Sequence, residues 1–376
     1  MYRRLVSGDP FAAAERAAGR RTGLAPAGDE AYRADLRVLH RQLLAKPALS
    51  PLGGLAAQSE ITRRMQTRLS VLHLLDGDPS IEAAPVRAPV FVTGLPRTAT
   101  TLTHRLLAQA TAVRAPMLWE LLRPEAGARG KRQSLRAARW MSRMYHASVP
   151  ATRDIHPSSA TSVEECTFLL PQTLMYEMMG PIPAYRQWYT ERDPSPDYRY
   201  LKQQLQVLQH GRPDRRWVLK SPFHLANLDP VFDTFPDATV VWTHRDPAVA
   251  LASWCSLIEA NMLMYNERVD RAEIGATWLP IWADATARAT RVRQRFPDRF
   301  HDVAHASLSA DPVGVTRELW RRLGIDADAA SVDRLITEAG VDGRRVPGRH
   351  RYPLERYGLS RAEVEAAFRT SDSRRG

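Results

Sequence analysis

The sequence is poor in cysteine and has no long apolar run, and each scarcity excludes classes of protein. Only two cysteines, Cys166 and Cys255, occur in 376 residues. They form neither a metal-ligand pattern nor a disulfide framework, which suits a reducing compartment. No stretch resembles a signal peptide or approaches the length of a membrane span. We therefore expect a cytoplasmic protein with no membrane span and no metal site.

Lysine is also scarce, since Lys46, Lys131, Lys202 and Lys220 are the only four. The net charge of +12 therefore comes from arginines, which are spread along the whole chain. A positive balance favours anionic partners. However, no basic run with interleaved aromatic residues appears, and an Arg-rich coding bias explains the charge equally well. The hydrophobic fraction of 44% is sufficient for a packed core.

A phosphate-binding pattern is present between residues 89 and 107, but it is incomplete. Residues 90–93 are apolar or β-branched and predict a strand, Gly94 follows, and a helical pattern begins after Thr100. In the triphosphate pattern G-x-x-x-x-G-K-[ST], Ala99 replaces the second Gly and Thr100 replaces the Lys. A helix N-terminus still offers unpaired N–H groups to an anion. We expect this loop to bind a phosphate, but not a β,γ-triphosphate.

The whole turn supplies the candidate ligands of this phosphate. They are Gly94, Leu95, Pro96, Arg97, Thr98, Ala99, Thr100 and Thr101. The alternative is an ordinary turn whose threonines only cap the helix. Ala resists a positive φ, so ordinary helical φ/ψ at Ala99 would preserve the site, and any other conformation would lower the affinity for the ligand.

Short strands alternate with helices from residue 89 onward. The predicted strands are 89–94, 217–219, 238–243 and 300–306, and the predicted helices that follow include 225–235, 248–263 and 312–323. This order predicts an α/β fold with a central parallel sheet flanked by helices. Sites are expected at the carboxyl ends of its strands.

The remaining segments suggest a division of the chain. Residues 1–85 read as a helical N-terminal extension, and 86–376 as the α/β domain. Inside that domain, 115–215 are expected to form a helical insertion that builds an acceptor pocket or only covers the core. Residues 340–376 are expected to form a closing loop and a tail.

Two further strand ends carry residues suited to anion chemistry. Lys220 ends one strand and can stabilise charge on a leaving phosphate, and His224 could remove a proton from an attacking hydroxyl. Arg245 and Ser253 follow the next strand, where nucleotide kinases often place an Asp that helps hold Mg²⁺. We expect this pair to hold a second anion directly. The alternatives are a solvated Lys220, a capping His224 and a surface ion pair of Arg245 with Asp246.

Other residues compete for the role of general base. Glu165, next to Glu164, is the main competitor to His224, and His156 is a weaker one. Thr161 and Glu164 also fit a capping box, T-x-x-E, which would be a purely structural use.

A basic loop near the C-terminus could close over a phosphate. It contains Arg349, His350 and Arg351, and it could equally be a solvated linker.

These segments together resemble the bacterial branch of the sulfotransferase family, enzymes that use 3′-phosphoadenosine 5′-phosphosulfate. The likeness runs over about residues 36–368. This branch commonly shows G-L-P-R-S-G-T-T, which residues 94–101 match except at Thr98 and Ala99. The resemblance implies that this loop binds the 5′-phosphosulfate.

The resemblance also assigns roles to the other strand ends. It implies that Arg245 and Ser253, at the family's eight-residue spacing, hold the 3′-phosphate and that Lys220 contacts the transferring group. The loop at 349–351 resembles the branch's C-terminal contact with the 3′-phosphate. The family's K-[ST]-H is K-S-P-F-H here, so His224 is offset. Other branches use a Glu base, as Glu165 would be.

The implied reaction is metal-independent, in-line transfer of a sulfonate to a hydroxyl or amine of a small-molecule, lipid or glycan acceptor. The product would be adenosine 3′,5′-bisphosphate. Two alternatives stay open: a P-loop kinase with Mg²⁺-dependent ATP chemistry, and a non-catalytic protein that binds nucleotides or nucleic acid. The net charge is the only support for the last.

Overall fold

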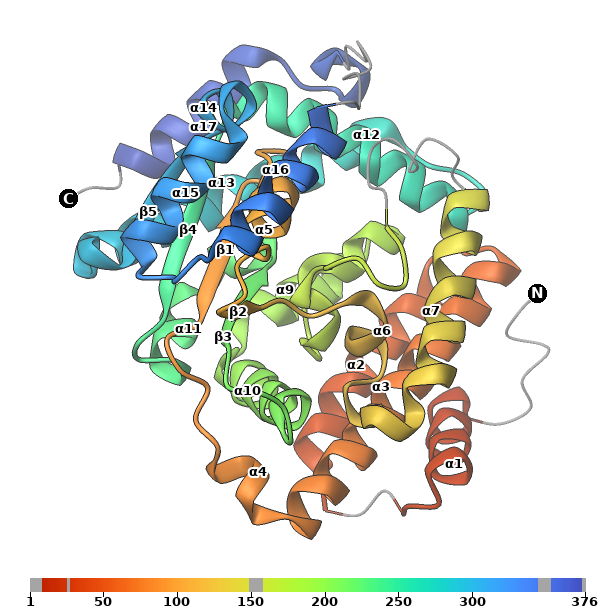
Figure 1. Cartoon of the computed structure of the whole chain (residues 1–376). Helices are drawn as coiled ribbons and strands as arrows, with labels where there is room; N and C mark the ends of the chain where they lie inside the picture. Colours follow the sequence, from red (N-terminus) through yellow and green to blue (C-terminus); the bar gives the residue numbers. More distant parts are fainter. Residues whose placement is uncertain (1–8, 26–27, 149–157, 344–352, 374–376) are drawn as a thin grey trace.

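Five parallel strands form a single sheet in the order β2-β3-β1-β4-β5. The computed structural model describes residues 9–25, 28–148, 158–343 and 353–373 of the chain (Figure 1). The strands are β1 (Val90–Gly94), β2 (Val113–Arg114), β3 (Arg216–Lys220), β4 (Thr239–His244) and β5 (Phe300–Ala304). β1 is central, because Val90 pairs with Val218 on one side and Thr239 on the other. The predicted α/β fold with a central parallel sheet is confirmed.

The helices fall into three consecutive groups. The first is α1 (Pro10–Thr22), α2 (Glu30–Ala45), α3 (Pro51–Gly77) and α4 (Pro79–Ala83). After β1 come α5 (Thr100–Leu107), α6 (Leu118–Leu122), α7 (Gly127–Ser148), α9 (Pro183–Glu191) and α10 (Ser195–Gln209), with short 3₁₀ turns η2 (Pro124–Ala126), η3 (Cys166–Leu169) and η4 (Leu174–Met179). After β3 come η5 (Pro222–Ala226), α11 (Leu228–Thr234), α12 (Pro247–Tyr265), α13 (Arg271–Arg295), η6 (Pro297–Arg299), α14 (His305–Ala310), α15 (Pro312–Leu323), α16 (Ala329–Gly343), η7 (Leu354–Tyr357) and α17 (Arg361–Ser373).

Alternate residues of the strands enter two separate cores. Phe91 and Leu219 face a large cluster that contains residues of α10 to α13. Val90 and Val92 face a smaller cluster with residues of α5, α15 and α16. Because both faces are covered, β1 is buried throughout, which explains its continuous apolar sequence.

The N-terminal helices share the larger core with the sheet. Phe11, Leu36 and Ile61 belong to the same buried cluster as Phe91. Figure 1 shows α1 to α3 on the side of the molecule away from β5. Residues 1–85 therefore pack onto the α/β part as well as preceding it.

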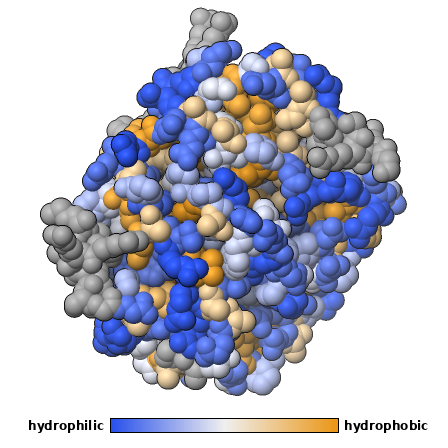
Figure 2. All heavy atoms as spheres, turned by 180° about the vertical axis from the view of Figure 1, so that it is seen from behind, coloured by the Kyte–Doolittle hydropathy of each residue, from blue (hydrophilic) through white to orange (hydrophobic). Residues whose placement is uncertain are grey.

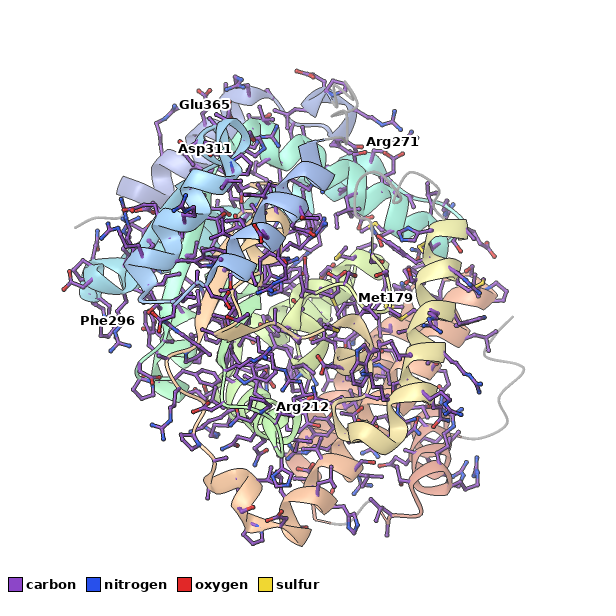
Figure 3. All side chains as sticks on the ribbon, viewed as in Figure 1. Met179, Arg212, Arg271, Phe296, Asp311 and Glu365 are labelled. Atoms are coloured by element: carbon purple, nitrogen blue, oxygen red, sulfur yellow. The ribbon has the colours of Figure 1, made fainter. Side chains whose placement is uncertain are left out.

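One carbonyl group links three distant segments of the chain. Met179, labelled in Figure 3, ends η4, and its carbonyl oxygen accepts a hydrogen bond from Asn266 Nδ2 at 2.8 Å. The ammonium of Lys46, just after α2, donates to the same oxygen. The helical insertion, the N-terminal helices and the end of α12 thus meet at this point.

The core helix α12 departs from the expectation about apolar length. By length and composition alone this helix could cross a membrane, whereas we expected no segment of that length and apolarity from the sequence. However, 61% of its apolar window is buried inside the protein, as is typical of a core helix. The molecular surface seen from behind is mainly hydrophilic, with apolar patches between charged residues (Figure 2).

Two local predictions need correction. The single helix predicted at 225–235 is two pieces, η5 and α11, because Asn227 has φ −131° and ψ 35° and so interrupts the helix. The two-residue strand β2 was not predicted, because it is too short to show a period.

Candidate functional site

The loop between β1 and α5 has an unusual backbone. Gly94 has φ +146°, and a Cβ atom there would lie 2.4 Å from the carbonyl oxygen of Thr243, so only glycine fits beside β4. Arg97 and Ala99 both have positive φ, of 67° and 71°. The first turn of α5 begins at Thr100, where backbone N–H groups remain for an anion.

Ala99 has a left-handed conformation, contrary to the helical φ/ψ that would have suited it. As the N-cap of α5 it has φ 71° and ψ 23°. This region costs a non-glycine residue about 1–2 kcal/mol. The loop therefore takes a glycine-type shape despite the alanine, and its neighbours must hold it there.

Thr98 helps to hold the loop from inside. Its side chain is buried, and its hydroxyl donates to the carbonyl oxygen of Leu95 at 2.6 Å and lies 2.5 Å from the hydroxyl of Thr243. This hydroxyl is thus directed into the fold and contributes to the shape of the loop. The expectation that it donates to a phosphate is not met in this geometry.

Lys220 and Glu165 form the first charged group beside the loop. The Lys220 side chain is fully buried, and its Nζ donates to Glu165 Oε1 at 2.5 Å and to Thr101 Oγ1 at 3.2 Å. Glu165 keeps 22% of its side chain exposed. A buried ammonium, a loop hydroxyl and a partly accessible carboxylate therefore meet where β3 ends.

Arg97, Arg245 and Ser253 form the second group. Arg97 Nε donates to Ser253 Oγ at 3.1 Å, and Arg245 Nη1 donates to the carbonyl oxygen of Arg97 at 3.0 Å. The alternative ion pair with Asp246 is not the arrangement found: Asp246 caps α12 and pairs with Arg361 at 2.8 Å. Two guanidinium groups and a hydroxyl are thus gathered within reach of one anion.

His224 lies in the core. It is fully buried, its Nε2 lies 3.0 Å from Cys166 Sγ, and its Nδ1 lies 2.9 Å from the hydroxyl of Tyr198. Burial lowers the pKa of His224 to about 3. The imidazole is therefore neutral and fully bonded, and its position does not support the role of general base that was predicted for it.

Several other predicted residues can also be located. Thr161 lies in a turn and the next helical turn begins at Cys166, so the predicted capping box is wrong. Glu164 is buried, and its Oε1 accepts from the Glu165 amide at 3.0 Å. The predictions for His156 and for Arg349, His350 and Arg351 fall outside the described residues.

His305 was not among the predicted site residues, although it follows β5 at the same edge of the sheet. Burial, and then the positive charges of Arg245 and Arg97, lower the pKa of His305. The imidazole is therefore close enough to respond to the second group. The strand predicted at 300–306 includes His305 near its carboxyl end, and that position was a signal that could have identified it.

Tyr145 was also not predicted, because nothing in the sequence indicates that α7 packs near Glu164 and Glu165. Its hydroxyl bonds to Asn261 of α12, burial raises its pKa, and the charges of Glu164 and Glu165 act on it in the same direction. Tyr145 thus borders the Glu165 side of the site.

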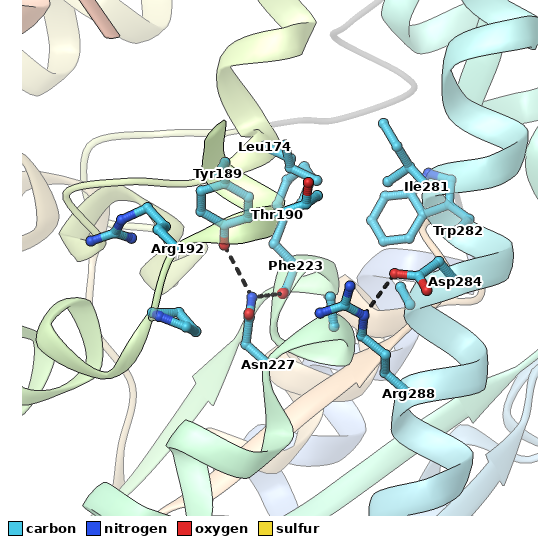
Figure 4. Close-up of a pocket in the computed structure, with 13 residues that line it drawn as sticks. Leu174, Tyr189, Thr190, Arg192, Phe223, Asn227, Ile281, Trp282, Asp284 and Arg288 are labelled. Carbon is cyan, nitrogen blue, oxygen red and sulfur yellow. Dashed lines mark hydrogen bonds and ion pairs between the residues drawn. The ribbon is translucent and has the colours of Figure 1, made fainter. Parts of the chain in front are cut away.

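A separate small pocket lies between the insertion and α13 (Figure 4). Tyr189, Phe223, Asn227, Trp282 and Arg288 are among its lining residues, and Asn227 Nδ2 donates to the Tyr189 hydroxyl at 3.1 Å. None of the anion-binding residues described above lines it. This pocket is therefore not the candidate site.

Comparison with known proteins gives one family. A sequence model described as the sulfotransferase family matches residues 89–329. Sulfotransferase STF1 from Mycobacterium tuberculosis is 28% identical with a TM-score of 0.81, over 95% of this chain and 97% of that one. Sulfotransferase STF9 from Mycobacterium avium is 25% identical with a TM-score of 0.83, over 96% and 95%. No curated protein matches the chain.

Proposed function

The chain belongs to the sulfotransferase family, and from this premise we propose that it uses 3′-phosphoadenosine 5′-phosphosulfate to sulfonate a hydroxyl or amine of a small-molecule, lipid or glycan acceptor. The observation that carries the proposal is the presence of two cationic groups at one loop. Lys220 with Thr101 forms one, and Arg97 with Arg245 and Ser253 forms the other. This donor has two separate anionic ends, at its 5′ and 3′ positions.

The residues present fit such a donor. The amides of the first turn of α5 and the Lys220 ammonium would hold the 5′ end, and the Arg245 and Ser253 side chains would hold the 3′-phosphate. When bound, the donor supplies a sulfonate whose S–O bond to the 5′-phosphate breaks as the acceptor atom bonds to sulfur. Lys220 and Arg97 would stabilise the negative charge that develops on the departing phosphate.

Glu165 is the proposed general base. It is the partly exposed carboxylate that contacts Lys220, so a proton from an acceptor hydroxyl could pass to Glu165 Oε1 or Oε2. Lys220 then has two roles: its ammonium donates to Glu165 Oε1 and so positions that carboxylate, and it would stabilise the charge on the leaving phosphate. Glu165 thereby takes precedence over the buried His224.

Calorimetry with adenosine 3′,5′-bisphosphate tests the proposal directly. We expect binding that does not require Mg²⁺ and that weakens at least about tenfold in Arg245→Ala and in Ser253→Ala, since each loses a hydrogen bond to a charged group. Arg295→Ala is the matched control, because Arg295 is an exposed arginine that pairs with Asp229 elsewhere.

The competing nucleotide functions predict different titrations. A P-loop kinase should bind ATP more tightly than the bisphosphate, and only with Mg²⁺. A general nucleic-acid binder should prefer duplex DNA, with a steep salt dependence. If the bisphosphate does not bind under any condition, the proposed donor is wrong.

A further inference from the structure

The outer face of α7 is strongly basic. The helix contains no Asp or Glu, and its exposed positions include Lys131, Arg132, Arg136, Arg139 and Arg143. At 100° per residue, the four arginines lie in one narrow stripe along the helix. In Figure 1 this helix lies on the side of the molecule opposite β5.

The arginine stripe has no anionic partner within the described chain. Arg132, Arg136, Arg139 and Arg143 form no ion pair with any described residue, whereas many arginines elsewhere do, such as Arg68 with Asp29. A row of uncompensated charges on one helix face is complementary to an extended anionic surface.

A second stripe on the same face is apolar. Trp140 is 66% exposed and Met144, one turn later, is 45% exposed. At the end of α12, Leu263 is 56% exposed, and Asn261 of that same end bonds to Tyr145 of α7. The exposed indole therefore lies directly beside the arginines, at an edge that α12 also reaches.

We propose that the outer face of α7 binds the surface of an anionic lipid bilayer. An amphipathic helix with Arg and Lys beside Trp lies in the plane of a bilayer interface, with its cations at the phosphate groups and its indole at headgroup depth. Nucleic acid would satisfy the arginine stripe alone. It would leave Trp140 and Met144 in water, so the pairing of both stripes favours lipid.

The docking does not depend on the reaction proposed above. It does concern the same side of the molecule, because Tyr145 faces inward from α7 toward the charges of Glu164 and Glu165. Bilayer binding by α7 would therefore bring the Glu165 side of the chain close to the interface.

Flotation of the full chain with lipid vesicles tests the proposal. The probes are vesicles of phosphatidylcholine alone and of phosphatidylcholine mixed with phosphatidylglycerol. We expect binding to the anionic vesicles only, weakened at least about a hundredfold in a triple variant carrying Arg136→Glu, Arg139→Glu and Arg143→Glu. Trp140→Ser should weaken binding about tenfold without changing its salt dependence.

Matched variants separate local from general charge effects. Arg199→Glu, Arg291→Glu and Arg317→Glu change the net charge equally at exposed arginines of α10, α13 and α15. This second triple variant should bind vesicles like the parent chain. Equal loss in both triple variants would overturn the proposal, and so would duplex DNA binding that is tighter than vesicle binding and insensitive to Trp140→Ser. Circular dichroism must show that each variant remains folded.

Discussion

At the scale of single residues, Glu165 and His224 differ in what they can do with a proton. Glu165 contacts the Lys220 ammonium and is partly exposed, whereas both ring nitrogens of His224 are bonded in the core. We expect Glu165→Gln to lower kcat about 10²- to 10⁴-fold with little change in bisphosphate affinity. Turnover and calorimetry on the same preparation check this.

His224→Ala should act on stability instead. Removing a buried ring leaves a cavity, so the free energy of unfolding should fall by about 2–4 kcal/mol, as measured in urea. The kcat of the molecules that remain folded should stay within about threefold of the parent value. A hundredfold loss of kcat at unchanged stability would instead make His224 the base.

Ala99 offers a test of stored backbone strain. Its φ of 71° is available to glycine at little cost, so Ala99→Gly should relieve strain in the folded state. Glycine also gives the unfolded chain more conformational entropy, which opposes this gain. The net effect should be a rise of about 0.5–1 kcal/mol in the free energy of unfolding. Ala108→Gly is the control: Ala108 ends the same helix at φ −67°, so glycine there should destabilise by a few tenths of a kcal/mol. Destabilisation in both variants would mean that Ala99 is not strained.

His305 predicts a pH dependence of anion binding. Burial and the charges of Arg245 and Arg97 lower its pKa in the free protein. A phosphate beside these arginines would offset their repulsion of the protonated imidazole, so the pKa of His305 should rise on binding. Binding should therefore be accompanied by uptake of a proton. The affinity should increase as the pH falls from above the pKa of the bound form to below that of the free form. Bisphosphate titrations from pH 5.5 to 8, compared with His305→Gln, check this.

The comparison with His305→Gln removes the titration of the phosphate itself, which both proteins experience equally. The parent chain should lose affinity more steeply with rising pH than the variant. Parallel curves would show that His305 does not sense the anion.

At the scale of elements, local signals predicted helices and strands well where caps and burial agree. The predicted bounds 312–323 are those of α15, because Asp311 caps its start and Gly324 adopts the left-handed conformation that ends it. Four of the five strands, all except β2, were predicted within two residues at each end, and in β1, β3 and β4 the signal was an almost continuously buried apolar run.

The site was predictable only in part, because its contacts join distant segments. The loop, Lys220, Arg245 and Ser253 follow strands, so topology alone places them at one edge of the sheet. The bond between Lys220 and Glu165 crosses 55 positions of sequence, and no spacing rule could have specified it. The left-handed Ala99 opposes local preference, so only the surrounding fold determines it.

At the scale of the whole molecule, the N-terminal helices are joined to the rest through the start of α3. Ser50 donates from its amide to the carbonyl oxygen of Tyr265 at 2.9 Å, and a Cβ atom on Gly53 would lie 2.2 Å from that same oxygen. Residues 1–85 and the α/β part also share one buried cluster. This packing predicts that the two parts unfold together.

Two spectroscopic probes can test this, because all nine tryptophans lie at or after Trp119. Tryptophan fluorescence reports on residues 86–376, whereas far-ultraviolet circular dichroism reports on every helix. We expect both signals to give the same midpoint in urea. Gly53→Ala should lower both midpoints together, through a loss of about 1–3 kcal/mol in the free energy of unfolding, because its methyl group would force α3 away from Tyr265. Gly77→Ala, in the same helix with nothing within 4 Å of its added carbon, should be neutral or slightly stabilising. If Gly53→Ala moves the dichroism transition and leaves the fluorescence transition in place, residues 1–85 are a separable extension rather than part of one cooperative unit.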